Sequence, residues 1–145
     1  MLAEIGTTCS AMEECYEQML SYAAEGLPTD QGSQSGSEVR VCLARSAVTL
    51  AGLIEACAEL AELQQVQPFL DVLERDARSS LAAIELVLAR PSISSQLIDN
   101  LNASIHLRAL LTDLFLVGEI AALERARPLP IVQGMQVSAD PGEAR

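Results

Sequence analysis

Lysine is absent from this sequence, whose 145 residues include nine basic side chains, all of them arginine. A P-loop needs a lysine beside the nucleotide phosphates, and Schiff-base catalysis needs a lysine nucleophile. Both chemistries are therefore excluded. Codon bias in a GC-rich genome is the simplest explanation for the missing lysine, and a pressure to avoid lysine modification is the other.

Aromatic residues and histidine are also scarce: the chain has two Tyr, two Phe, no Trp and one histidine, His106. A single histidine excludes a zinc site built from several histidines, and the Glu-x-x-His pairs of di-iron bundles do not occur. The net charge of −11 and the few rings available for base stacking exclude nucleic acid as the expected partner. The charge suits a basic protein partner, or it serves only to keep an apolar chain soluble.

No segment of the sequence has the pattern of a targeting or membrane-spanning segment. The beginning, "MLAEIGTTCS", lacks a basic region followed by an apolar run. The most apolar stretch, Leu107 to Leu123, is interrupted by Arg108, Asp113 and Glu119, and it falls short of about 20 uncharged residues. We therefore expect a soluble cytoplasmic protein without membrane contact, whose four cysteines are reduced.

The spacing of apolar residues predicts an all-α fold. Half of the residues are apolar, and they recur every three or four positions, which indicates helices over about 2–25, 38–65, 68–89 and 92–126. A flexible Gly/Ser loop is expected over 26–37. In the fourth region the apolar face turns by about a third of a turn, so we expect a kink or split near 102–104. We predict an antiparallel four-helix bundle over 1–127 with an extended tail over 128–145.

The cysteines form no motif within any one helix. Cys9 and Cys15 would lie about 9 Å apart along a helix axis, whereas a disulfide needs Cα atoms within about 7 Å. Across a hairpin of the first two helices, Cys9 and Cys57 would lie at similar heights on inward faces. Two buried thiols acting as small apolar groups are the simpler interpretation. A redox pair or a soft-metal site is the alternative.

A site for a ligand between helices has four candidate residues: Cys9, Met12, Cys57 and His106. His106 shares a stripe with Asp99, Asn102 and Asp113, which we interpret as a polar helix face. The sequence assigns no catalytic residue, no metal ligand and no cofactor.

Two features favour binding of another protein. Glutamates at i, i+4 and i+7 form an acidic ridge on the second expected helix, and the region from Leu107 to Ile120 is apolar around nearly its whole circumference. A helix that is apolar all round is buried all round. It is therefore central in a larger fold, covered by the tail or part of an oligomer, and we favour a homodimer. The candidate partner-binding residues are Glu55, Glu59, Glu62, Leu110, Phe115, Leu116 and Ile120.

The sequence is thus best interpreted as a small acidic helical protein of bacterial type that acts by binding another protein. Compact helices, an acidic face and an exposed apolar patch suit an adaptor, a chaperone, an immunity-type inhibitor or a regulator. The alternative is a helical bundle that binds a metal, a haem-like group or a small apolar ligand between its helices. An enzyme ranks third, because the chain has no lysine, one histidine and no nucleophile motif.

Overall fold

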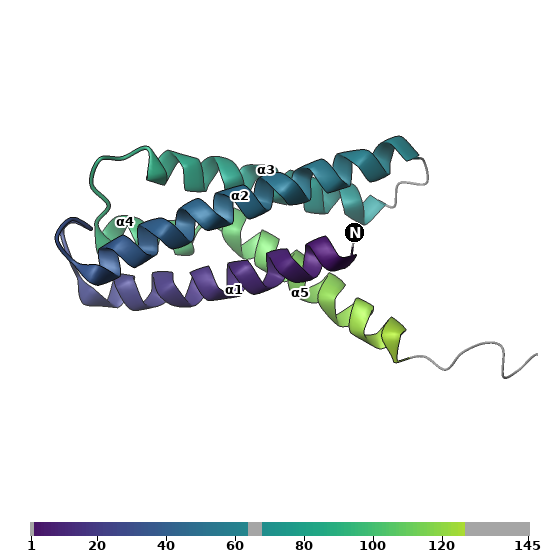
Figure 1. Cartoon of the computed structure of the whole chain (residues 1–145), viewed down its shortest axis with the longest axis horizontal. Helices are drawn as coiled ribbons and strands as arrows, with labels where there is room; N and C mark the ends of the chain where they lie inside the picture. Colours follow the sequence, from purple (N-terminus) through teal and green to yellow (C-terminus); the bar gives the residue numbers. More distant parts are fainter. Residues whose placement is uncertain (1, 64–67, 127–145) are drawn as a thin grey trace, which may run out of the picture.

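The computed structural model of the chain describes residues 2–63 and 68–126, and within these ranges it is built from helices without any strand. The prediction of an all-α fold is confirmed (Figure 1). The helices are α1 (Leu2–Glu25), α2 (Gln34–Leu63), α3 (Pro68–Leu88), α4 (Ser95–Asn102) and α5 (Ile105–Arg125).

The ends of the helices follow from local signals. Gly26 has a φ of 66°, the left-handed conformation in which helices commonly end, and it terminates α1. The side chain of Ser94 caps α4 by accepting a hydrogen bond from the backbone N–H of Leu97. Ser104 does the same for α5 through the N–H of Leu107 at 3.3 Å. The helix is therefore interrupted between α4 and α5, in the region where the change in direction of the apolar face predicted a kink or split.

Helix α2 begins at Gln34, four residues before the start that the sequence indicated. Ser33 accepts a hydrogen bond from the N–H of Gly36 at 3.0 Å, which caps this early first turn. The connection after α1 is correspondingly shorter than the expected loop over 26–37. The tail expected over 128–145 lies outside the described residues.

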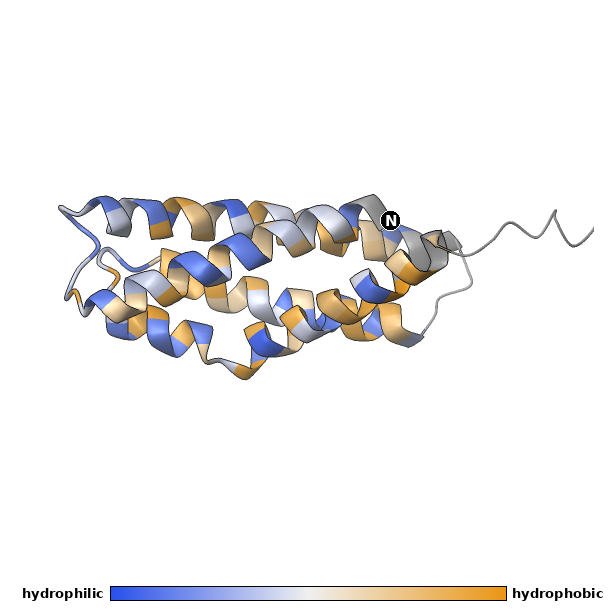
Figure 2. Ribbon diagram, turned by 90° about the horizontal axis from the view of Figure 1, so that it is seen from below, coloured by the Kyte–Doolittle hydropathy of each residue, from blue (hydrophilic) through white to orange (hydrophobic). Residues whose placement is uncertain are grey.

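The helices enclose one core. Helices α1 and α3 each contact α2, and each also contacts α4 and α5, whereas α2 touches neither α4 nor α5 in the described ranges (Figure 1). Hydrophobic and hydrophilic residues alternate around the helices, as packing on a shared core requires (Figure 2). The buried side chains come from all five helices and include Met12, Met19, Leu43, Leu53, Leu73, Ile84, Ile98, Leu107 and Leu114.

Helix α2 is also long and apolar enough, over Gln34–Glu59, to cross a membrane by length and composition alone. The core helix of a soluble protein meets the same criterion. In this fold α2 places Val39, Leu43, Leu50 and Leu53 in the core. The most apolar stretch of the sequence, Leu107 to Leu123, lies instead in α5.

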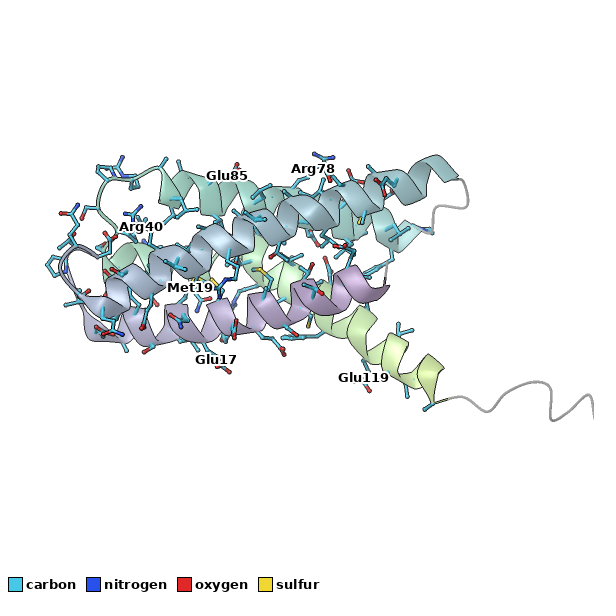
Figure 3. All side chains as sticks on the ribbon, viewed as in Figure 1. Glu17, Met19, Arg40, Arg78, Glu85 and Glu119 are labelled. Carbon is cyan, nitrogen blue, oxygen red and sulfur yellow. The ribbon has the colours of Figure 1, made fainter. Side chains whose placement is uncertain are left out.

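A partly buried ion pair joins the segments that meet at one end of the fold. The carboxylate of Asp30 accepts hydrogen bonds from Arg40 Nε and from the N–H of Ile93, both at 2.7 Å. Arg40 also donates to the carbonyls of Leu88 at 3.3 Å and Arg90 at 3.2 Å. Figure 3 shows Arg40 beside the link between α3 and α4. Asp30 and Arg40 thus connect the loop after α1, helix α2 and the end of α3.

A second set of hydrogen bonds fixes the start of α4 against the end of α1. The hydroxyl of Tyr22 donates to the carbonyl of Ile93 at 2.7 Å, and Ser95 Oγ donates to the carbonyl of Tyr22 at 2.6 Å. Leu27 and Ser95 exchange two further bonds at 2.8 Å, one through each backbone N–H. All these polar groups are therefore satisfied at a crowded junction.

Gly36 provides a test of this junction, because a Cβ at this position would lie 2.2 Å from the backbone oxygen of Asp30. We expect Gly36→Ala to lower the free energy of unfolding by about 2–4 kcal/mol, since the backbone must shift. The control is Gly52→Ala in the same helix, where the nearest atom lies 3.9 Å away. This change should stabilise the protein by about 0.5–1 kcal/mol. Urea denaturation measures the free energy of unfolding of both variants. Equal changes in the two variants would contradict the close approach of Gly36 to the backbone of Asp30.

Asp30 provides a second test, because the hydrogen bond from Arg40 holds the pKa of its carboxyl below its usual range. We expect Asp30→Asn to destabilise the protein at neutral pH by about 1–2 kcal/mol, since the partly exposed guanidinium of Arg40 loses its charged partner. A lowered carboxyl pKa stabilises the fold above the unfolded pKa, and this contribution is lost as the pH falls through the folded pKa. The difference from wild type should therefore vanish in acid. Glu74→Gln, in the partly exposed Arg78–Glu74 pair, should cost less than about 0.5 kcal/mol.

Candidate functional site

An open groove with a volume of about 1070 Å³ lies between α1 and α5. Side chains from both helices line it, so its shape depends on how α5 crosses α1 (Figure 1). The lining residues that the following argument uses are Glu13, Glu14, Tyr16, Glu17 and Leu20 from α1, and Arg108 and Phe115 from α5.

The groove combines exposed apolar side chains with negative charge. Tyr16, Leu20 and Phe115 are 38%, 46% and 48% exposed, and the two rings are half of the four aromatic residues in the chain. All three glutamates that line the groove are exposed. Figure 3 shows one of them, Glu17, pointing away from the neighbouring helices while Met19 points between them. Arg108 is the one basic side chain in the groove lining, so carboxylates outnumber guanidinium groups by three to one.

The second half of α5 extends the apolar part of this surface. Leu116, Ile120 and Leu123 follow one another at spacings of four and three, and they are 51%, 51% and 62% exposed. This part of α5 leaves the other helices in Figure 1, and Figure 2 shows hydrophobic residues continuing along it. We call these three residues the α5 stripe. Large apolar side chains gathered at one place on a surface mark a site of interaction.

Within the described chain, only the first half of the region from Leu107 to Ile120 is buried, and the covering of its second half by the tail or by an oligomer stays a prediction. Leu107, Leu110 and Leu114 are fully buried, because the first half of α5 packs between α1 and α3. Leu110 is therefore a core residue, and it is no longer a candidate for binding a partner. Phe115, Leu116 and Ile120 remain candidates because they are exposed.

The acidic ridge lies elsewhere. Glu55 and Glu59 are exposed on α2, and α2 does not contact α5 in the described structure. The side chain of Glu62 lies outside the described residues. The predicted partner-binding set is thus divided between two helices that do not touch, and the carboxylates beside the apolar surface of α5 come from α1 instead.

The candidate ligand-binding residues are not gathered in one place. Met12 and Cys57 are each 1% exposed and lie in the core, Cys9 is half-buried, and His106 is exposed. Burial and Glu13 raise the pKa of the Cys9 thiol, and burial and Glu74 raise that of Cys57, so neither thiol is affected by the other. The carbonyl of His106 accepts a hydrogen bond from Ser80 Oγ at 2.9 Å. In the described part of the chain, no three His, Cys, Asp or Glu side chains are arranged to hold a metal ion.

Sequence reasoning missed a pair of carboxyl groups between α3 and α5. Asp113 is 7% exposed, and its Oδ2 atom has no hydrogen-bond partner among the described groups. Burial, then a hydrogen bond with Asp76 and the charge of Asp76, raise the pKa of Asp113 to about 7. Asp113 therefore keeps its proton to a higher pH than an ordinary carboxyl group does. The stripe that Asp113 shares with His106 had been interpreted as a polar helix face, and only the packing of α3 on α5 reveals the pair.

Comparison of this chain with protein-family models, with curated proteins and with solved structures gave no match. The functional argument therefore depends on the geometry and charge of the surfaces described above.

Asp113 makes the stability of the fold depend on pH. A raised carboxyl pKa means that the folded state binds the proton more tightly, so stability is complete below the unfolded pKa of about 3.9 and is lost as the pH rises through about 7. Asp113→Asn mimics the protonated acid. We expect it to be more stable than wild type by about 2 kcal/mol near pH 8, with little difference near pH 4.

Urea denaturation across this pH range measures the effect of Asp113→Asn. The exposed Asp99, at the surface of α4, supplies the control Asp99→Asn, which should follow the wild-type pH profile. A wild-type profile in the Asp113→Asn variant would show that the pKa of Asp113 is not raised in the folded protein.

Proposed function

We propose that this chain is a protein-binding module whose groove between α1 and α5 holds an amphipathic helix of a partner, apolar on one side and basic on the other. The observation that carries this proposal is the juxtaposition of Tyr16, Leu20 and Phe115 with the glutamates of α1 in one open groove. Recognition of a helix in a groove uses apolar anchors along one face of the bound helix.

The scaffold of the proposal is an antiparallel four-helix bundle in which α4 and α5 together take the place of the fourth helix. Support comes from the closed cycle of contacts, in which α1 packs on α2, α2 on α3, α3 on α5 and α5 on α1. A bundle of this kind leaves grooves between neighbouring helices. The ribbon of α5 diverges from α1 toward its C-terminal end (Figure 1).

The apolar side chains of the groove supply the affinity. Exposed aromatic rings are common among the residues that carry most of the binding energy, because they bury a large area at little entropic cost. Tyr16 and Phe115 come from different helices, so a bound helix between them contacts both walls. The α5 stripe continues this apolar surface beyond the groove.

The charge of the groove selects a basic occupant. Glu13 and Glu17 are one helical turn apart, where like charges repel unless a cation lies between them. A second copy of this chain would bring the same glutamates face to face in a symmetric dimer, and each copy carries a net charge of −11. A partner rich in arginine or lysine relieves this repulsion and is attracted from a distance. The homodimer expected from the sequence is therefore the competing occupant.

An adaptor, a chaperone, an inhibitor and a regulator can all bind a partner helix in this way. We propose that the protein does so in the cytoplasm and that it is not an enzyme. A ligand held between helices is the weaker alternative, because His106 is exposed whereas Met12 and Cys57 lie in the core.

A synthetic helical peptide with leucine on one face and arginine on the other tests the groove directly by fluorescence anisotropy. We expect Phe115→Ser to weaken binding about tenfold, because it removes a central ring of the groove. Leu86→Ser is the matched control, since Leu86 is 71% exposed on α3 and does not line the groove. The double change Glu13→Gln and Glu17→Gln should slow association and reduce its dependence on salt.

Two results would contradict the proposal. The first is binding of the peptide to Phe115→Ser as tightly as to wild type. The second is a wild-type dimer, seen by light scattering, that dissociates in Phe115→Ser, because the groove would then hold a second copy of the chain.

A further inference from the structure

Cys15 on α1 and Cys42 on α2 face each other across the interface of these helices. Helices α1 and α2 pack against each other here, and Glu14, next to Cys15, lies 3.9 Å from Arg45, one turn along α2 from Cys42. Each thiol affects the pKa of the other, as two groups that lie close together do. Cys15 is fully buried and Cys42 is 7% exposed, and both thiols are free. Neither belongs to the groove between α1 and α5. The pair is therefore a separate feature that the proposed function does not use.

Small molecules can approach the pair from one side. Cys42 lines a surface depression of about 330 Å³, together with Glu14, Val41 and Arg45. Arg45 and Glu14 lie 3.9 Å apart at its edge, and both side chains are largely exposed. Cys42 therefore borders this depression, whereas Cys15 lies beneath the surface.

The two thiols are chemically unequal. The hydrogen bond from Cys42 lowers the pKa of Cys15, and Ser46 and the positive charge of Arg45 act in the same direction. The pKa of Cys42 is raised, first because its thiol donates to Cys15 and then because of burial. The thiolate is the reactive form of cysteine, so Cys15 is the nucleophile of the pair and Cys42 the second thiol.

We propose that Cys15 and Cys42 are a peroxide-sensitive thiol pair that closes to a disulfide between α1 and α2. The Cys15 thiolate attacks one oxygen of hydrogen peroxide, the O–O bond breaks, and the departing hydroxide takes a proton to become water. Cys15 is then a sulfenic acid. The sulfur of Cys42 attacks the sulfur of Cys15, the S–O bond breaks, and a second water leaves with the proton of Cys42. Two thiols lose two electrons, and peroxide gains them.

The other two cysteines lack these properties. The pKa values of Cys9 and Cys57 are raised by burial, and neither has a second thiol among the groups that affect it. A small oxidant is specified because Cys15 has no exposed surface. The disulfide would link α1 to α2 and restrict the unfolded chain, which raises thermal stability.

Hydrogen peroxide treatment of the whole protein, followed by thiol counting and mass spectrometry, tests the pair. We expect two of the four thiols to disappear and the intact mass to fall by about 2 Da, since two hydrogen atoms leave. Cleavage after arginine isolates Cys42 between Arg40 and Arg45, and cleavage after glutamate separates Cys9 from Cys15. The cross-linked peptide should contain Cys15 and Cys42, and reduction should restore four thiols.

Variants provide the controls. In Cys9→Ser three thiols should fall to one, and in Cys15→Ser all three should remain. In Cys42→Ser the oxidation should stop at the sulfenic acid of Cys15, so two thiols remain and no cross-link forms. The peptide map of the wild-type protein decides the question even where a buried substitution prevents folding. Four free thiols after treatment, a cross-link between any other two cysteines, or oxidation of Cys15 without a cross-link would each overturn the proposal.

Discussion

The ion pair between buried Asp30 and partly exposed Arg40 joins the loop after α1 to α2 and to the end of α3. Asp30 anchors the loop after α1 through the backbone N–H of Ile93 and the guanidinium of Arg40, and Arg40 reaches two carbonyls at the end of α3. The carboxylate of Asp30 is removed from water and needs these partners, since an unpaired buried charge costs several kcal/mol of folding free energy. The loop therefore has one arrangement, and α2 starts close against it, with Gly36 beside the backbone of Asp30.

The start of α2 sets which residues face each other across the helices. If α2 began at 38, as the sequence indicated, Cys9 would lie near the height of Cys57. In the structure α2 begins at Gln34, the connection after α1 is shorter, and the alignment differs by more than one helical turn, so that Cys15 lies near Cys42 instead. Glu14 and Arg45, which lie 3.9 Å apart, show the same alignment. Composition could not reveal this start, because a run rich in glycine and serine has a weak helix propensity that tertiary contacts override here.

The sequence predicted the helices better than the surfaces. Apolar spacing identified each helical region, and the turning of the apolar face located the break between α4 and α5, because both signals are local. The division of α5 into a buried half and an exposed half cannot be predicted from neighbouring residues in the sequence. It depends on the point at which α5 leaves α1 and α3, so Leu110 and Phe115 look alike in the sequence but have opposite environments. The same reason hides Asp113, whose partner Asp76 comes from α3.

Helix α1 contributes neighbouring residues to both the thiol pair and the groove. Both sites therefore depend on the rotation of α1 about its axis. Cys15 faces α2 and is fully buried, whereas Glu14 and Tyr16, on either side of it, line the groove toward α5. Successive residues on a helix point about 100° apart, so a rotation of α1 by one position would bury a carboxylate and expose the thiol. Such a rotation would also move Tyr22 and the end of α1 away from Ile93 and Ser95. The junction around Asp30 therefore holds in place a thiol pair and a groove that it does not touch.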